Sequence, residues 1–173
     1  MMVANHASWM DIPFLGLMSG FRNYKFISKS ELRKVPILGK AIQVGGNIMV
    51  DRTNRRSQIK TLKDGIQILK DGVFLCTFPE GTRSRTGKLQ EFKNGAFKMA
   101  HKAGAPVIPI TIVGSADVMP SHWMFPYRPA RNVCKMIINE PVESNDKTEA
   151  ELAAAVRKAM IHSLPEANRP DAE

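Results

Sequence analysis

Cysteine is scarce in this sequence, and long apolar runs are absent from it. The 173 residues include two cysteines, Cys76 and Cys134, and each lies inside an apolar, strand-like stretch. Cysteines in such positions are typical of free, buried, reduced thiols and argue against a disulfide framework. No run approaches the roughly 18 consecutive apolar residues of a transmembrane helix, and no signal or transit peptide is visible. A chain of this length suffices for one globular domain with a sizeable core.

Motifs for metals and nucleotides are missing as well. Three of the four histidines are scattered along the chain, and no group of His, Cys, Asp and Glu has the spacing of metal ligands. Neither a Walker-type glycine loop nor a Gly-x-Ser-x-Gly nucleophile elbow occurs. We therefore expect neither a metal nor another cofactor.

Positive charge dominates and is unevenly placed. The net charge is +9, and the stretch from Arg22 to Lys70 alone carries twelve Lys or Arg against three Asp or Glu. Such a basic face suits anionic lipid surfaces, phosphorylated substrates and acyl carriers, and it would also attract nucleic acid. A solvated basic surface without a partner is the alternative.

The alternation of apolar runs with amphipathic segments predicts an α/β layered domain. We expect one domain over residues 1–164, followed by a frayed polar tail at 165–173. A capping box of Thr148 and Glu151 is expected to open the last helix. The expected strands are 1–4, 26–28, 48–50, 73–78 and 107–114, and the expected helices are 12–18, 57–70, 94–103 and 148–163.

The stretch from Asn5 to Asp11 places a histidine and a carboxylate five positions apart. A neutral imidazole is the usual general base for a hydroxyl proton near pH 7, and a carboxylate behind it fixes the tautomer and stabilises the imidazolium. His6 and Asp11 can form this pair if the chain turns from a strand into a helix between them. The alternative is a strand-end and a helix-start residue without a joint task.

The apolar run Val73–Phe78 leads directly into the polar loop Pro79–Lys88, which contains Gly81, Arg83 and Arg85. Proteins of the α/β class build ligand sites where buried strands end in such loops. Arginine forks suit phosphate, and glycine lets the backbone approach it closely. The loop thus indicates a site for the phosphate of a small substrate, with a solvated basic loop as the alternative.

Two further stretches predict strands. Gly45–Arg52 predicts a short strand that ends in Asp-Arg, which places another cation at a strand end, although a salt-bridged surface turn is the alternative. Val107–Gly114 predicts a buried strand in which Pro109 lacks a backbone donor. That lack favours a sheet edge or a bulge.

These blocks, in this order, resemble the glycerolipid acyltransferases, and most closely the 1-acyl-sn-glycerol-3-phosphate acyltransferases. The blocks are 5–11, 46–52, 78–84 and 107–110. The resemblance implies a mixed, mostly parallel sheet flanked by helices, in which 134–141 supplies the following strand. It also implies transfer of a fatty acyl group from a thioester of coenzyme A or acyl carrier protein to the sn-2 hydroxyl of lysophosphatidic acid, giving phosphatidic acid.

The resemblance assigns roles to single residues. It makes His6 the general base, oriented by Asp11. Glu80 would repel phosphate, so we expect it to hold Arg83 or a substrate hydroxyl. The residues assigned to the acceptor phosphate are Glu80, Gly81 and Arg83, with Arg52 as a second contact and Arg85 as a weaker candidate.

Two neighbouring assignments are less direct. Pro109 is associated in the family with acyl-donor binding, although a role in the shape of its strand is easier to defend. Ser8 lies next to the proposed base, but no nucleophile elbow surrounds it. We therefore reject a covalent acyl-serine route and expect Ser8 to cap the helix that begins near Trp9.

Members of this family carry an apolar membrane-binding segment before the first block, whereas this chain begins four residues before Asn5. We expect that segment to be missing and the first strand to be shortened; the alternative is that this protein contacts the membrane through surface residues alone. We expect peripheral association with a membrane on its reducing side, cytoplasmic or plastid, and no nucleic-acid partner. Two groups of residues are candidate membrane contacts. The helical group, whose spacing is more typical of core, is Phe14, Leu17, Met18 and Phe21. The loop group, which is the better candidate, is Trp123, Met124 and Phe125.

Two functional classes therefore remain, an acyltransferase and a catalytically silent basic module that binds anionic lipid or nucleic acid. The pairing of His6 and Asp11 with the loop at 80–83 favours the enzyme, because a binding module has no need of both. Within the enzyme class, glycerol-3-phosphate or another lysophospholipid is an alternative acceptor.

Overall fold

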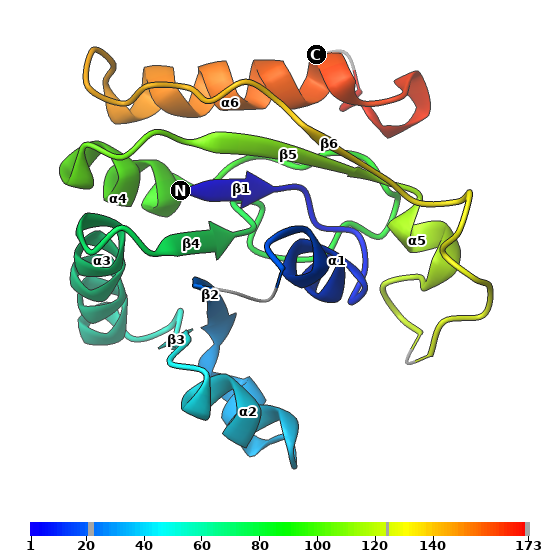
Figure 1. Cartoon of the computed structure of the whole chain (residues 1–173), viewed down its shortest axis with the longest axis horizontal. Coiled ribbons are helices and arrows are strands. Elements are labelled where there is room, and N and C mark those ends of the chain that lie inside the picture. The colour runs from blue at the N-terminus through cyan, green and yellow to red at the C-terminus, as the bar shows by residue number, and fades with distance from the viewer. Residues whose placement is uncertain (21–22, 124, 172–173) are drawn as a thin grey trace.

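A computed structural model describes residues 1–20, 23–123 and 125–171, and its centre is a six-stranded sheet (Figure 1). The strand order is β3-β2-β4-β1-β5-β6. Neighbouring strands pair in parallel except β5 and β6, which are antiparallel. The sheet is therefore mixed and mostly parallel, as the resemblance implies. The strands are β1 Met2–Ala4, β2 Tyr24–Lys29, β3 Ile48–Val50, β4 Phe74–Thr77, β5 Ile108–Val113 and β6 Lys135–Ile138.

Helices cover both faces of this sheet. Side chains of α3, α4 and α6 pack on one face in the larger core cluster, whereas α1 packs on the other face in the smaller one. Figure 1 shows α6 along the β5 and β6 side, and α3 and α4 at the left end of the sheet. The helices are α1 Asp11–Met18, α2 Leu38–Val44, α3 Arg55–Lys70, α4 Gly95–Ala103, α5 Ser115–Val118 and α6 Glu149–Ser163, with the 3-10 turns η1 Ser30–Lys34 and η2 Glu166–Asn168.

The central strands send successive side chains to opposite faces of the sheet. Val3 of β1 and Leu75 of β4 are buried in the larger cluster, and Ala4 and Cys76 are buried in the smaller one. Because both faces are covered, these strands are nearly continuous apolar runs. Each fully buried side chain of this kind stabilises the fold by about 1.5–3 kcal/mol. The result is a rigid platform whose parallel strands end at one common edge.

The predicted elements agree closely with the observed ones. The strand predicted at 48–50 is β3, and α6 opens with the predicted capping box of Thr148 and Glu151. Both cysteines are free, as predicted; Cys76 is buried and Cys134 is half-buried. The elements η1, α2, α5 and η2 were not predicted, since each is too short for an apolar period to show.

Pro109 lies in an internal strand, so the prediction of a sheet edge or a bulge is wrong. β5 pairs with β1 on one side and with β6 on the other, without a break in register. The lack of an N–H is tolerated because β6 ends at Ile138, opposite Ile110. The following residue, Asn139, donates its backbone N–H to the carbonyl oxygen of Pro109 at 2.9 Å.

The tail after α6 is held in place as far as residue 169, so the expectation of fraying is wrong there. Asn168 accepts a backbone hydrogen bond from Leu89 at 3.0 Å and donates its side-chain amide to the carbonyl of Gly87 at 3.1 Å. Arg169 donates to the carbonyl of Leu164 at 3.0 Å. The tail therefore braces the loop that follows β4.

Two candidate membrane contacts, Phe21 and Met124, lie outside the described residues. Phe14 and Met18 pack against the smaller core cluster, whereas Leu17 and the loop residues Trp123 and Phe125 are exposed. Within the described ranges, none of the helices has the length and apolar content needed to cross a bilayer.

Candidate active site

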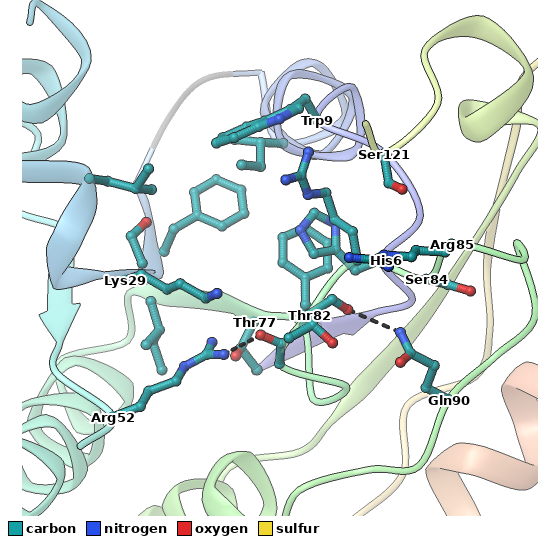
Figure 2. A pocket seen from close by; sticks show the side chains of 18 of the residues that line it. His6, Trp9, Lys29, Arg52, Thr77, Thr82, Ser84, Arg85, Gln90 and Ser121 are labelled. Carbon is teal, nitrogen blue, oxygen red and sulfur yellow. Dashed lines mark hydrogen bonds between the residues drawn. The ribbon is translucent and has the colours of Figure 1, made fainter. Parts of the chain in front are cut away.

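A pocket of about 1090 Å³ opens at the carboxyl ends of β1 to β4 (Figure 2). Its walls come from segments that follow four different parallel strands, which is where α/β sheets build ligand sites. Four cationic side chains line it, and no Asp or Glu does so within the described part of the chain. The cations are Lys29, Arg52, Arg83 and Arg85, and apolar lining is supplied by Ile12, Phe26, Ile27, Leu32 and Phe78.

His6 and Asp11 form the pair that the spacing predicts. Nδ1 of His6 lies 2.8 Å from Oδ2 of Asp11, and the Asp11 side chain is fully buried. The same oxygen accepts the backbone N–H groups of Ala7 at 2.8 Å and Ser8 at 2.9 Å. Because a carboxylate can only accept, Nδ1 of a neutral His6 carries the proton and Nε2 is a free base.

The loop after β4 forms hydrogen bonds with both the N–H and the carbonyl group of His6. The His6 N–H donates to Oε1 of Glu80 at 2.6 Å, and the His6 carbonyl accepts the Ser84 N–H at 2.7 Å. The imidazole ring stacks on Phe78, with ring centroids 3.9 Å apart and planes 13° from parallel. The first and third sequence blocks are therefore joined at the histidine itself.

Glu80 accepts hydrogen bonds from two backbone groups, and among the described residues its carboxylate forms no ion pair with Arg83. A contact with a substrate hydroxyl stays a prediction. The second oxygen of Glu80, Oε2, accepts the Gln90 N–H at 3.0 Å, and the residue is 4% exposed. Burial raises the pKa of Glu80 to about 7, although the donors at His6 and Gln90 act in the opposite direction. Glu80 thus connects the start and the end of the loop to the histidine.

Asn5 explains how the chain leaves the sheet just before His6. Its side-chain amide donates to the Ile112 carbonyl at 2.8 Å and accepts the Ile112 N–H at 2.7 Å. The amide therefore imitates a peptide group and continues the pairing with β5 after β1 has ended at Ala4. Sequence reasoning placed Asn5 in a motif block but assigned it no role.

Arg83 lies over the ring of Trp9, with its guanidinium carbon 4.4 Å from the ring centroid. Its Nη1 is buried without a hydrogen-bond partner among the described residues, as is Oδ1 of Asp11. Burial lowers the pKa of Arg83, while the charge of Asp11 raises it. The half-buried guanidinium therefore has hydrogen-bonding capacity that the described residues leave unused.

Arg52 is held by the loop after β4. Its Nη1 donates to the carbonyl of Gly81 (Figure 2). Gly81 has φ of +76°, and a Cβ there would lie 3.0 Å from Nζ of Lys93 and 3.2 Å from Nη1 of Arg52. Glycine is thus required both by the backbone conformation and by the close approach of two cations.

Lys29 is a lining residue that sequence reasoning missed. It is the last residue of β2 and pairs in register with Val50, two residues before Arg52. The two cations therefore lie on neighbouring strand ends and both face the pocket (Figure 2). Only the pairing of β2 with β3 reveals this, because the two residues are far apart in the sequence.

Ser8 and Pro109 do not face the pocket. Ser8 is fully buried, donates its hydroxyl to the carbonyl of Met119 at 2.6 Å, and accepts the Met10 N–H at 3.1 Å. It supports the turn before α1, which begins at Asp11 and has no side-chain cap. Pro109 is buried in β5 and is not among the lining residues described. Ser8 is therefore unavailable as a nucleophile.

The arrangement combines a histidine–aspartate pair, four cations and apolar wall surface in one pocket. His6, Trp9, Arg52 and Ser121 are drawn around the cavity in Figure 2. A hydroxyl compound that carries both a phosphate and an apolar chain would find partners for all three of its parts here. The described residues contain no group of three or more His, Cys, Asp and Glu that could hold a metal.

Comparison with known proteins agrees with this geometry. The family model described as "Acyltransferase" matches residues 1–113. A 1-acyl-sn-glycerol-3-phosphate acyltransferase from Chlamydomonas reinhardtii is 39% identical over 94% of this chain. A chloroplastic protein of the same name from Arabidopsis thaliana is 43% identical over 69% of this chain.

A solved structure shares the fold. The crystal structure of the 1-acyl-sn-glycerophosphate acyltransferase PlsC from Thermotoga maritima matches with a TM-score of 0.75 and 35% identity, over 94% of this chain and 63% of that one. The chain spans 48% of the Chlamydomonas relative and 33% of the Arabidopsis relative.

Proposed function

The chain belongs to the acyltransferase family, and we propose that it transfers a fatty acyl group from an acyl thioester to the sn-2 hydroxyl of lysophosphatidic acid. The product would be phosphatidic acid, an intermediate of phospholipid biosynthesis. The observation that carries the proposal is the His6–Asp11 pair in the wall of a pocket with four cations. The names of the relatives support the choice of acceptor.

His6 acts as the general base. Nε2 takes the proton of the acceptor hydroxyl while its oxygen attacks the thioester carbonyl carbon. The carbon–sulfur bond then breaks, and the leaving thiolate takes up the proton from the imidazolium. Asp11 stabilises that imidazolium through Nδ1. Alignment of both substrates supplies the proximity term, and the base contributes about a hundred- to ten-thousand-fold in rate.

The cations bind the acceptor phosphate. Arg83 offers the donor Nη1, which has no partner among the described residues, and Arg52 supplies a second contact. Lys29 adds a third charge beside Arg52, and Arg85 remains a weaker candidate. Gly81 allows the loop backbone to come close, and Glu80 serves this site indirectly because it holds the loop on His6.

The acyl donor is a thioester of coenzyme A or of acyl carrier protein, and its chain lies along the apolar wall. Pro109 contributes to donor binding only through the shape of β5. The acceptor and the donor both bear long acyl chains, so the protein works at a membrane surface as a peripheral protein. The reduced state expected of its two cysteines fits the reducing side of that membrane, in the cytoplasm or in a plastid.

An acceptor and donor panel tests the proposal. Thiol release is measured in mixed micelles with acyl-coenzyme A or acyl carrier protein as donor. The acceptors are lysophosphatidic acid, glycerol-3-phosphate and lysophosphatidylcholine. We expect release that depends on lysophosphatidic acid. Preference for another acceptor would overturn the acceptor assignment, and no release with any pair would favour a silent lipid-binding module.

A further inference from the structure

The loop after β4 is long and irregular. Residues 78–94 join β4 to α4 without forming a helix or a strand, and they include Glu80, Arg83 and Gln90. The two ends of the loop meet where the Lys93 N–H donates to the Pro79 carbonyl at 2.9 Å. Because an irregular segment loses much backbone entropy when it is ordered, its conformation depends on the elements that it contacts.

Gln90 connects the second half of this loop to the histidine. Its N–H donates to Oε2 of Glu80 at 3.0 Å, and Oε1 of the same carboxylate accepts the His6 N–H at 2.6 Å. The Gln90 side chain also donates to the carbonyl of Thr82 at 3.2 Å (Figure 2). A displacement of Gln90 therefore reaches His6 through a single side chain, that of Glu80.

The end of the chain holds the loop immediately before Gln90. Asn168, the last residue of η2, accepts the Leu89 N–H at 3.0 Å through its carbonyl and donates its side-chain amide to the Gly87 carbonyl at 3.1 Å. Gly87 has φ of +77°, and a Cβ there would lie 3.3 Å from Nδ2 of Asn168. Glycine thus allows the amide to come close. The two hydrogen bonds together fix both the position and the orientation of this turn.

Packing and charge keep the C-terminal part of the chain against the loop. Leu89 of the loop and Leu164 at the end of α6 are buried in the larger core cluster. On the other side of Gln90, Nη2 of Arg157 in α6 donates to Oε1 of Glu91 at 2.9 Å. Gln90 therefore lies between two attachments to the C-terminal part of the chain.

We propose that Asn168 is a positioning residue for the acyl transfer. It fixes the turn before Gln90, and through Gln90 and Glu80 it keeps His6 in place. Asn168 is not among the described residues that line the pocket, and the family model ends at residue 113, so the motif blocks do not include it. The inference rests on the proposed function, because it concerns the rate of that reaction.

Hydrogen exchange tests this link without turnover. Asn168→Ala removes the donor to the Gly87 carbonyl. We expect the exchange protection of the His6 and Gln90 amides to fall about three- to ten-fold, the equivalent of one hydrogen bond. The Ile112 N–H in β5, which donates to a side chain at 2.7 Å, should keep its protection. Unchanged protection at His6, or an equal fall at Ile112, would overturn the proposal.

The control is Arg169→Ala, which removes a hydrogen bond inside the tail, from Arg169 to the Leu164 carbonyl, and should leave the protection at His6 as in wild type. Asn168→Asp is a second variant of nearly the same size as wild type. It also lacks the donor, so it should behave as Asn168→Ala does. Thermal melting checks that each variant is folded, and the aspartate variant decides the question if the alanine variant does not fold.

Acyl transfer at saturating donor and lysophosphatidic acid measures the consequence for the reaction. The kcat of Asn168→Ala should fall about two- to ten-fold, and that of Arg169→Ala should not. In a Glu80→Gln background the same Asn168 substitution should change kcat by less than about two-fold, because the path to His6 is already broken. Effects that multiply, or wild-type kcat in the folded Asn168 variants, would overturn the proposal. Wild type that transfers nothing with any pair of substrates would refute the proposed function instead, and exchange at His6 would still test Asn168.

Discussion

Substitution of Glu80 by glutamine should affect the stability of the protein and its catalytic activity in two ways that can be measured separately. Both carboxylate oxygens accept backbone N–H groups, from His6 at 2.6 Å and from Gln90 at 3.0 Å. Glutamine keeps the shape but turns one acceptor into an NH2 donor that faces an N–H group. The lost bond and the orphaned donor together cost about 1–3 kcal/mol. Either His6 or the loop is then released.

The ionised carboxylate of Glu80 also destabilises the folded state, by an amount that depends on pH. Burial raises the pKa of Glu80 from 4.5 to about 7, so the folded state binds this proton more tightly than the unfolded state. The contribution of Glu80 to the free energy of unfolding is therefore full below pH 4.5 and falls as pH rises to 7, by about 3 kcal/mol. Glutamine does not titrate. Between pH 4.5 and pH 7, the difference in free energy of unfolding between Glu80→Gln and wild type should therefore shift by about 3 kcal/mol in favour of the variant.

Urea unfolding at a series of pH values and acyl transfer at pH 8 measure the two effects. We expect kcat of Glu80→Gln to fall about ten- to a hundred-fold, because displacement of the base by about 1 Å has an effect of that order. The exposed Glu140→Gln is the control for the loss of one charge. A stability difference that does not change with pH would refute the raised pKa, and full activity would refute the role of Glu80 in holding His6.

Three further predictions concern the same pocket. Asp11→Asn should lower kcat about a thousand-fold, since an amide neither fixes the Nδ1–H tautomer nor stabilises the imidazolium; single-turnover rates measure this, and a near-normal rate contradicts the pair. Arg83→Ala should raise KM for lysophosphatidic acid about ten- to a hundred-fold, with Arg83→Lys between, and an unchanged KM would remove Arg83 from the phosphate site. Ser8→Ala should lower the free energy of unfolding by about 1–3 kcal/mol, because the Met119 carbonyl loses its hydrogen-bond donor. The folded variant should still transfer the acyl group, and a folded but inactive variant would support the covalent acyl-serine route.

Local patterns predicted much of the site. The apolar run before Pro79 and the polar loop after it are both local signals. Because parallel strands end at one edge of a sheet, the sequence alone suffices to expect His6 and Arg83 in one site. The His6–Asp11 pair followed from the turn between a strand and a helix.

The remaining features depend on pairings that are distant in sequence. Lys29 enters the pocket through the register of β2 with β3, and Asn5 acts on Ile112 of β5. Glu80 has backbone partners, which side-chain chemistry alone does not indicate. The prediction that Pro109 lies at a sheet edge was wrong because β6 ends beside it. The residues around Pro109 do not show where the neighbouring strand ends.

The central claim is that His6 is the base of an acyl transfer to lysophosphatidic acid. Thiol release from a long-chain acyl-coenzyme A, with and without lysophosphatidic acid, tests it most directly when wild type is compared with His6→Ala in mixed micelles. Circular dichroism establishes that both proteins are folded. We predict release by wild type only when the acceptor is present, and none above background by His6→Ala. Equal acceptor-dependent release by a folded His6→Ala protein would contradict the claim.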